Sequence, residues 1–296
     1  MATDRRVGIV VDSAASLPPD APRLEGLHLV PMRLTFGDRT YDDGEELSPA
    51  EFYRMLRDSS DLPTTSAPSP AAFLKAFTHA SREAEAVLCL TVASRFSASS
   101  DSAVSAAREA GTVIPGLKVI VLDSGTAAGG EGLVALEAWR AAGDGQGLEQ
   151  VKAAAQAVIA RVRLLAFVDT LHYLWKGGRV PGIAHAGASL LRLKPMFELA
   201  EGEVTSVARP RTTRNAVKRL KELMGDRVAA DRPVHAAVLH ADAAAPAEEL
   251  HSWIESEFEC EELYVSEFSP VMGAHIGPGL VGAAFWTEDL PKSAGA

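Results

Sequence analysis

Three short apolar runs constrain the fold more than any other feature of this chain. Residues 7–11, 86–92 and 118–124 are rich in aliphatic and β-branched side chains, as expected for strands buried on both faces of a parallel sheet. Helix start signals lie between the first two: Ser48-Pro-Ala-Glu51 forms a capping box with proline at the first helical position, and Ser69-Pro70 repeats the signal. This alternation predicts an α/β domain built on a parallel sheet.

The second half of the chain has a different pattern. Residues 143–147 (Gly-Asp-Gly-Gln-Gly) form a glycine-dense break between two helical patterns, and we place the domain boundary there, dividing the chain into residues 1–147 and 148–296. Beyond it, paired strands around Glu201-Gly202 and further helices and strands predict an α+β domain. Within the first half, residues 27–41 are expected to form a hairpin or an edge strand.

Charge and composition exclude several partners and sites. A net charge of −10 disfavours nucleic acid and anionic membranes as general partners. No apolar run approaches the ~20 residues of a membrane-spanning helix, so we expect no stable membrane insertion. The start of the chain shows no secretory signal, and its two cysteines form no disulfide framework. A cytoplasmic protein is expected.

The sequence lacks the common catalytic and cofactor motifs in their proper context. Residues 277–282 match the G-x-G-x-x-G spacing of dinucleotide sites, but they lead into a strand-like segment rather than a helix. There is no phosphate-binding P-loop, no H-E-x-x-H metal motif and no G-x-S-x-G nucleophile elbow. We therefore expect no metal and no cofactor.

Four loops retain functional interest. Residues 63–70 and 93–100 are rich in serine and threonine beside helix starts, residues 274–279 place a histidine on a glycine-rich turn, and residues 169–180 end in two glycines between cations. Hydroxyls and free N–H groups suit an oxyanion of one charge. Taken singly, each loop has a purely structural alternative as a helix cap or a turn. For residues 169–180 this alternative is a capped helix end that carries Arg179.

Taken together and in order, these motifs resemble the DegV family, whose characterised members include the fatty-acid-binding subunit of bacterial fatty acid kinase. The resemblance spans nearly the whole chain. It implies a ligand bound between the two domains and presented to a separate ATP-dependent kinase, which phosphorylates its carboxyl group. The motifs are Val10-Val-Asp-Ser-Ala14, Thr65-Ser-Ala-Pro-Ser69, Ser94-Arg-Phe-Ser97, Thr170-Leu-His-Tyr-Leu-Trp-Lys-Gly-Gly-Arg179, Leu193-Lys-Pro195 and His275-Ile-Gly-Pro-Gly279.

The resemblance also implies roles for individual residues. The hydroxyls of Thr65 and Ser97, with Ser66 beside them, would bind the fatty-acid carboxylate, and His275 would approach the same head group. Arg179 would contact the acyl phosphate or the kinase. The glycines expected to shape the two specific loops are Gly177, Gly178, Gly277 and Gly279.

Two residues depart from the family pattern. Ala67 stands where glutamine is usual, and Ala98 replaces a glycine between Ser97 and Ser99, so head-group geometry or ligand choice is expected to differ. Residues 186–193 and 196–199 are candidates for the lining of an acyl tunnel, with ordinary core packing as the alternative.

The leading functional hypothesis is a non-enzymatic lipid-binding protein that buries a long acyl chain and presents its carboxylate to a kinase, in support of phospholipid synthesis. The runner-up is a serine-dependent acyl transferase or hydrolase that uses Ser97 with His275 as base. A third possibility is a binding module for another small carboxylate or an isoprenoid acid.

Overall fold

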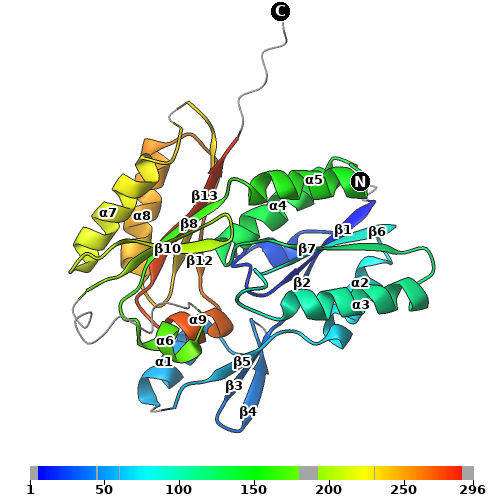
Figure 1. Ribbon diagram of the computed structural model, residues 1–296, viewed down its shortest axis with the longest axis horizontal. Coiled ribbons are helices and arrows are strands. Elements are labelled where there is room, and N and C mark those ends of the chain that lie inside the picture. The colour runs from blue at the N-terminus through cyan, green and yellow to red at the C-terminus, as the bar shows by residue number, and fades with distance from the viewer. Residues whose placement is uncertain (1–5, 45, 60, 180–192, 230, 289–296) are drawn as a thin grey trace, which may run out of the picture.

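The computed structural model describes residues 6–288 except 45, 60, 180–192 and 230. Its first sheet is four-stranded and wholly parallel, in the order β2-β1-β6-β7 (Figure 1). The three apolar runs of the sequence form its adjacent strands β1, β6 and β7, and the edge strand β2 comes from the predicted excursion. The bounds are β1 (Val7–Asp12), β2 (Leu27–Val30), β6 (Ala86–Thr91) and β7 (Lys118–Asp123).

Helices cover both faces of this sheet. Val10 packs with the aromatic side chains of α2 on one face, whereas its neighbour Ile9 belongs to the cluster that contains α4 and α5 on the other. This alternation is the period-two pattern of a strand buried on both faces. The helices are α2 (Pro70–Ala80) and α3 (Ser99–Val113) on the first face, and α4 (Gly129–Gly143) and α5 (Leu148–Ile159) on the second.

A small antiparallel sheet, in the order β4-β3-β5, lies beside the parallel one. Its hairpin turns at Gly37, whose φ of 61° is readily adopted only by glycine. The third strand, β5, contains Thr65, for which the serine- and threonine-rich sequence predicts a loop. This sheet consists of β3 (Arg33–Phe36), β4 (Arg39–Asp42) and β5 (Thr64–Ser66), and it is accompanied by the capped helix α1 (Pro49–Asp58) and the 3-10 turn η1 (Ala21–Arg23).

The second large sheet is mixed, in the order β10-β9-β8-β13-β11-β12, and only β11 and β12 run parallel. Helices α7 and α8 pack on one face through an apolar cluster that includes Leu220 and Leu250. The strands are β8 (Arg163–Phe167), β9 (Met196–Ala200), β10 (Glu203–Ala208), β11 (Val234–His240), β12 (Cys260–Glu267) and β13 (Val281–Thr287), and the helices are α6 (His172–Gly177), α7 (Thr213–Gly225), α8 (Ala244–Glu257) and α9 (Pro270–Ile276).

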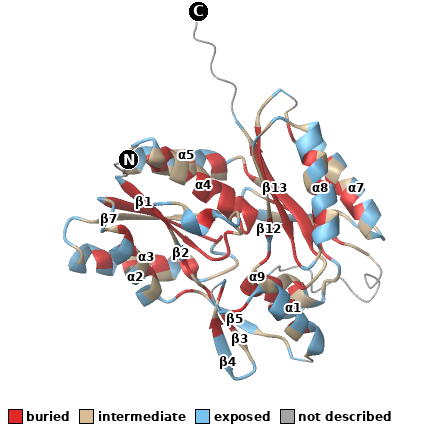
Figure 2. Ribbon diagram, turned by 180° about the vertical axis from the view of Figure 1, so that it is seen from behind, coloured by how far each residue is buried: buried red, intermediate tan, exposed pale blue. Residues whose placement is uncertain are grey.

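Helix α4 packs against both large sheets (Figure 2). Its glycines permit this close approach: a Cβ on Gly129 would lie 2.8 Å from the Cβ of Ala237 in β11, and one on Gly132 would lie 2.5 Å from the carbonyl oxygen of Ala15. The boundary expected at residue 147 falls between α4 and α5, which pack against each other. The predicted combination of a parallel-sheet α/β part and a mixed α+β part is confirmed.

The structure differs from the sequence-based expectation for His275. This residue lies in the last turn of the short helix α9 rather than on a glycine-rich turn. The helix starts at Ser269-Pro270, with the Ser269 hydroxyl accepting a hydrogen bond from the Met272 N–H, and ends at Gly277, where φ is 73°.

Candidate functional site

A cavity of about 290 Å³ lies where the carboxyl ends of the parallel strands meet β5, α9 and the inner face of the mixed sheet. Twenty-five described residues line it, and five of these carry polar side chains, whereas the others are apolar. The five are Thr65, Ser66, Ser97, Arg179 and His275, the residues expected to contact a carboxylate, an acyl phosphate or a partner.

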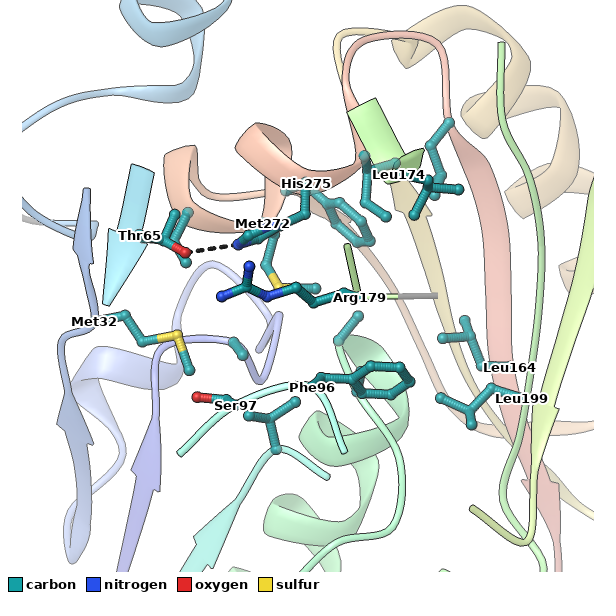
Figure 3. A pocket seen from close by; sticks show the side chains of 18 of the residues that line it. Met32, Thr65, Phe96, Ser97, Leu164, Leu174, Arg179, Leu199, Met272 and His275 are labelled. Atoms are coloured by element: carbon teal, nitrogen blue, oxygen red, sulfur yellow. Dashed lines mark hydrogen bonds between the residues drawn. The ribbon is translucent and has the colours of Figure 1, made fainter. Parts of the chain in front are cut away.

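The polar and apolar linings occupy different parts of the cavity. Figure 3 shows Thr65 and Ser97 on one side, with the apolar Met32 between them, and Leu164 and Leu199 on the other side. Leu199 comes from the 196–199 segment that was a candidate for the tunnel, and its neighbour Phe197 lines the cavity too. Of the other candidate segment, residues 186–192 lie outside the described residues.

Thr65 and His275 form the first part of the polar end. The Thr65 Oγ1 and His275 Nε2 atoms are 2.6 Å apart, which joins β5 to α9 across 210 positions of sequence. Burial, assisted by the positive charge of Arg179, lowers the pKa of His275 to about 4. The imidazole is therefore neutral near pH 7, and its Nδ1 is buried with no hydrogen-bond partner among the described residues.

Ser97 forms the second part, in the loop between β6 and α3. Its Oγ accepts the Ser99 N–H at 3.2 Å and lies 3.0 Å from the Ser99 Oγ. Ala98 between them has φ −83° and ψ 15°, a conformation that alanine adopts without strain. The methyl group that departs from the family pattern thus requires no special backbone at this position.

Arg179 is exposed and lies between these two parts (Figure 3). Its Nη1 donates a hydrogen bond to the Gly177 carbonyl at 2.7 Å, and the guanidinium points toward the side of the cavity that carries Thr65 and Ser97 (Figure 3). The sequence alternative of a capped helix end also describes this position, because Gly178 has φ 66° and its N–H bonds to the Leu174 carbonyl.

The four glycines of the two specific motifs lie where α6 and α9 come together. A Cβ on Gly177 would lie 2.9 Å from His275 Nδ1, and one on Gly277 would lie 2.0 Å from the Tyr173 ring. Gly279 has φ 91° and is closely approached by Asp169, whose carboxylate pairs with Lys194. Three of these four glycines, Gly177, Gly277 and Gly279, therefore permit the close packing of this corner.

Ser97 and His275 do not form a nucleophile–base pair in this arrangement. Among the described residues, the Ser97 hydroxyl is hydrogen-bonded to Ser99 and the His275 ring to Thr65. The described part of the chain also contains no cluster of three or more His, Cys, Asp or Glu side chains suited to a metal ion. None of its helices has both the length and the apolar character needed to cross a bilayer.

Sequence reasoning missed two kinds of residue that matter here. The mixed sheet lines the apolar part of the cavity with side chains from three strands, Leu164 among them, and only the 196–199 segment was singled out. The buried hydroxyl of Ser99, in contact with Ser97, was also missed. Its signal was the Ser-x-Ser spacing before a helix, which commonly marks a cap.

This chain is similar in sequence and fold to described relatives. The model of the family described as "Uncharacterised protein, DegV family" matches residues 6–288. A DegV domain-containing protein of Streptomyces coelicolor is 35% identical over 280 residues, covering 94% of this chain and 97% of the relative. One from Halalkalibacterium halodurans is 31% identical over 284 residues, covering 96% and 99%.

Solved structures agree with this chain along its length. A DegV family protein from Thermus thermophilus, described by its fatty acid binding, has a TM-score of 0.87 and 31% identity, covering 96% of this chain and 100% of its own. DegV of Bacillus subtilis, described as a fatty acid binding protein, has a TM-score of 0.84 and 26% identity, covering 96% and 99%. The chain belongs to the DegV family.

Proposed function

We propose that this protein binds a long-chain fatty acid, with the acyl chain in the apolar part of the cavity and the carboxylate at Thr65, Ser66, Ser97 and His275. The observation that carries the proposal is that the five polar side chains of the lining include Thr65 and Ser97 on one side, whereas the other twenty lining residues are apolar. The Thermus thermophilus and Bacillus subtilis relatives, described as fatty-acid-binding, support it.

The energetics fit an amphipathic ligand. Burial of an acyl chain is worth about 0.8 kcal/mol per methylene, so the apolar wall accounts for affinity. The head group needs donors, and neutral hydroxyls supply hydrogen bonds of about 1 kcal/mol each without a buried ion pair. Because His275 is neutral near pH 7, it holds the carboxylate as a hydrogen-bonding group rather than as a cation.

The finer part of the proposal is that the bound carboxylate is presented to a separate ATP-dependent kinase, which forms the acyl phosphate. Arg179 supports it, because an exposed cation beside the polar end can guide a phosphorylated head group or an acidic partner surface. In this proposal the chain works in the cytoplasm and performs no chemistry alone.

The test of fatty-acid binding is native mass spectrometry of the purified protein, followed by extraction and identification of any lipid. We expect one long-chain acid per chain, or stoichiometric uptake of added hexadecanoate. Thr65→Val and Ser97→Ala should each weaken uptake, whereas Thr40→Val, on the exposed hairpin, should not. A protein that binds no added fatty acid would refute the proposal.

Presentation to a kinase is tested separately, by incubating the loaded protein with ATP and a fatty acid kinase catalytic subunit. Acyl phosphate should form only when both proteins are present, and Arg179→Ala should reduce its rate more than it reduces fatty-acid affinity. Turnover of an acyl ester by the isolated chain, or an acyl adduct on Ser97, would instead establish the hydrolase alternative.

A further inference from the structure

A fully buried carboxyl group lies directly behind the polar end of the cavity. Asp12 ends β1 with no exposed surface. Its two oxygens accept the backbone N–H groups of Ala14 and Val92, each at 3.1 Å, and both of those residues line the cavity. One wall of the cavity is therefore built on this carboxyl group.

Hydroxyl groups connect Asp12 to the cavity. Ser99 lies close enough to Asp12 for its side chain to lower the pKa of that carboxyl group, and the Ser99 Oγ lies 3.0 Å from the Ser97 Oγ. Ser99 is itself fully buried, whereas Ser97 reaches the cavity. Ser99 therefore lies between the cavity residue Ser97 and the buried carboxyl group of Asp12.

The protons of these three groups have two arrangements. When Asp12 is ionised, Ser99 donates its only hydroxyl proton to Asp12 and can offer Ser97 only lone pairs. When Asp12 is protonated, it can donate to Ser99, Ser99 to Ser97, and Ser97 to the ligand. In the second arrangement every hydroxyl donor points toward the ligand. It also removes the negative charge of Asp12, which would otherwise lie about three hydrogen-bond lengths, roughly 8 Å, from a bound carboxylate.

We propose that a fatty-acid carboxylate binds at Ser97 together with one proton taken from solvent, and that this proton resides on Asp12. The site then holds one negative charge, on the ligand, instead of two. The inference rests on the proposed function, because it needs a carboxylate at Ser97. Asp12 acts as a positioning residue, since it reaches the ligand only through Ser99.

The surroundings of Asp12 favour its neutral form. Burial, opposed by the backbone and Ser99 hydrogen bonds, raises the pKa of Asp12 to about 6, and Asp43 adds to the shift. The titratable groups that face it from other elements are Asp43, Glu131 of α4 and Cys89 of β6, and burial raises the pKa of each. A carboxylate bound at Ser97 would therefore lie near an acid, Asp12, whose pKa is already raised toward neutral pH.

Calorimetric titration with hexadecanoate at pH 7.5, in two buffers of different ionisation enthalpy, measures proton uptake directly. We expect between about half and one proton per fatty acid, and affinity that falls by up to about tenfold per pH unit above pH 7. Ser99→Ala should abolish the uptake because it removes the hydroxyl that couples Ser97 to Asp12. Ser94→Ala, an exposed serine of the same loop, should leave it unchanged.

Asp12→Asn cannot titrate and should also bind without proton uptake, whereas His275→Gln should retain the uptake even if affinity falls. Ser99→Ala keeps the backbone bonds of Asp12, so the test stands if Asp12→Asn fails to fold. Zero uptake in the native protein, or native uptake that persists in Ser99→Ala, would overturn the inference. Failure to bind hexadecanoate at all would instead overturn the proposed function.

Discussion

Gly177 and Gly178 are adjacent, yet the structure assigns them opposite sensitivities to a methyl group. A Cβ on Gly177 would lie 2.9 Å from His275 Nδ1. A Cβ on Gly178 would meet nothing within 4 Å, but the residue has φ 66°. Gly177→Ala should therefore disturb the ligand site, and Gly178→Ala should strain the backbone without reaching it.

The magnitudes follow from these contacts. To restore an ordinary contact, the His275 ring must move by about half an ångström away from Gly177, which disturbs its 2.6 Å hydrogen bond with Thr65. Loss of one hydrogen bond from the head-group site, about 0.5–1.5 kcal/mol, weakens fatty-acid binding roughly two- to tenfold. Alanine at 178 in a left-handed conformation costs about 1 kcal/mol of folding free energy. Alanine at 177 lies in a helix, where it is intrinsically favoured over glycine.

The assay measures both properties on both variants: urea denaturation for the free energy of unfolding, and displacement of a fluorescent fatty acid for affinity. Gly177→Ala should lose affinity with little loss of stability, and Gly178→Ala should lose stability with affinity within twofold of the native protein. If the two variants lose affinity equally, or if Gly177→Ala binds like the native chain, the reasoning about His275 is wrong.

Three further predictions concern the same corner and the loop before α3. The lowered pKa of His275 keeps the imidazole neutral in the folded protein, so the free energy of unfolding should fall as the pH drops below 6.5, by about 2 kcal/mol at pH 5. In His275→Gln, the urea concentration at the midpoint of unfolding should depend less on pH over this range. Gly277→Ala, at φ 73° and 2.0 Å from the Tyr173 ring, should lower the melting temperature far more than Gly37→Ala, at φ 61° in open space. Ala98→Gly should change fatty-acid affinity without relieving backbone strain, because Ala98 lines the cavity and its φ of −83° is open to alanine; affinity within twofold of the native protein would show that the methyl group does not contact the ligand.

Much of the architecture could be predicted because it is encoded locally. Apolar runs such as residues 86–92 identify buried strands without reference to anything distant, and the serine caps at Ser48 and Ser69 mark where helices begin. Strand β5 could not be found this way. Its three residues, Thr-Thr-Ser, become a strand only because they pair with β3 across a gap in sequence.

The candidate site was reached by a different route. Thr65 and His275 are 210 positions apart, and no local pattern indicates that their side chains meet. Their expected roles came from resemblance to a family, which names residues but supplies no geometry. Helix α9 did carry a local signal, since Ser269-Pro270 repeats the Ser-Pro start of two other helices, but at seven residues it was obscured by the glycines that follow.

The glycine-lined contacts of α4 have a consequence for how the molecule unfolds. Eleven of its fifteen residues are buried, and a single apolar cluster joins it to side chains from both large sheets, including Leu88 and Leu239. Separating the two sheets would expose this shared interior, at a cost that approaches global unfolding. Denaturation should accordingly show one cooperative transition, and amide protons of α4 should exchange only when the entire chain opens.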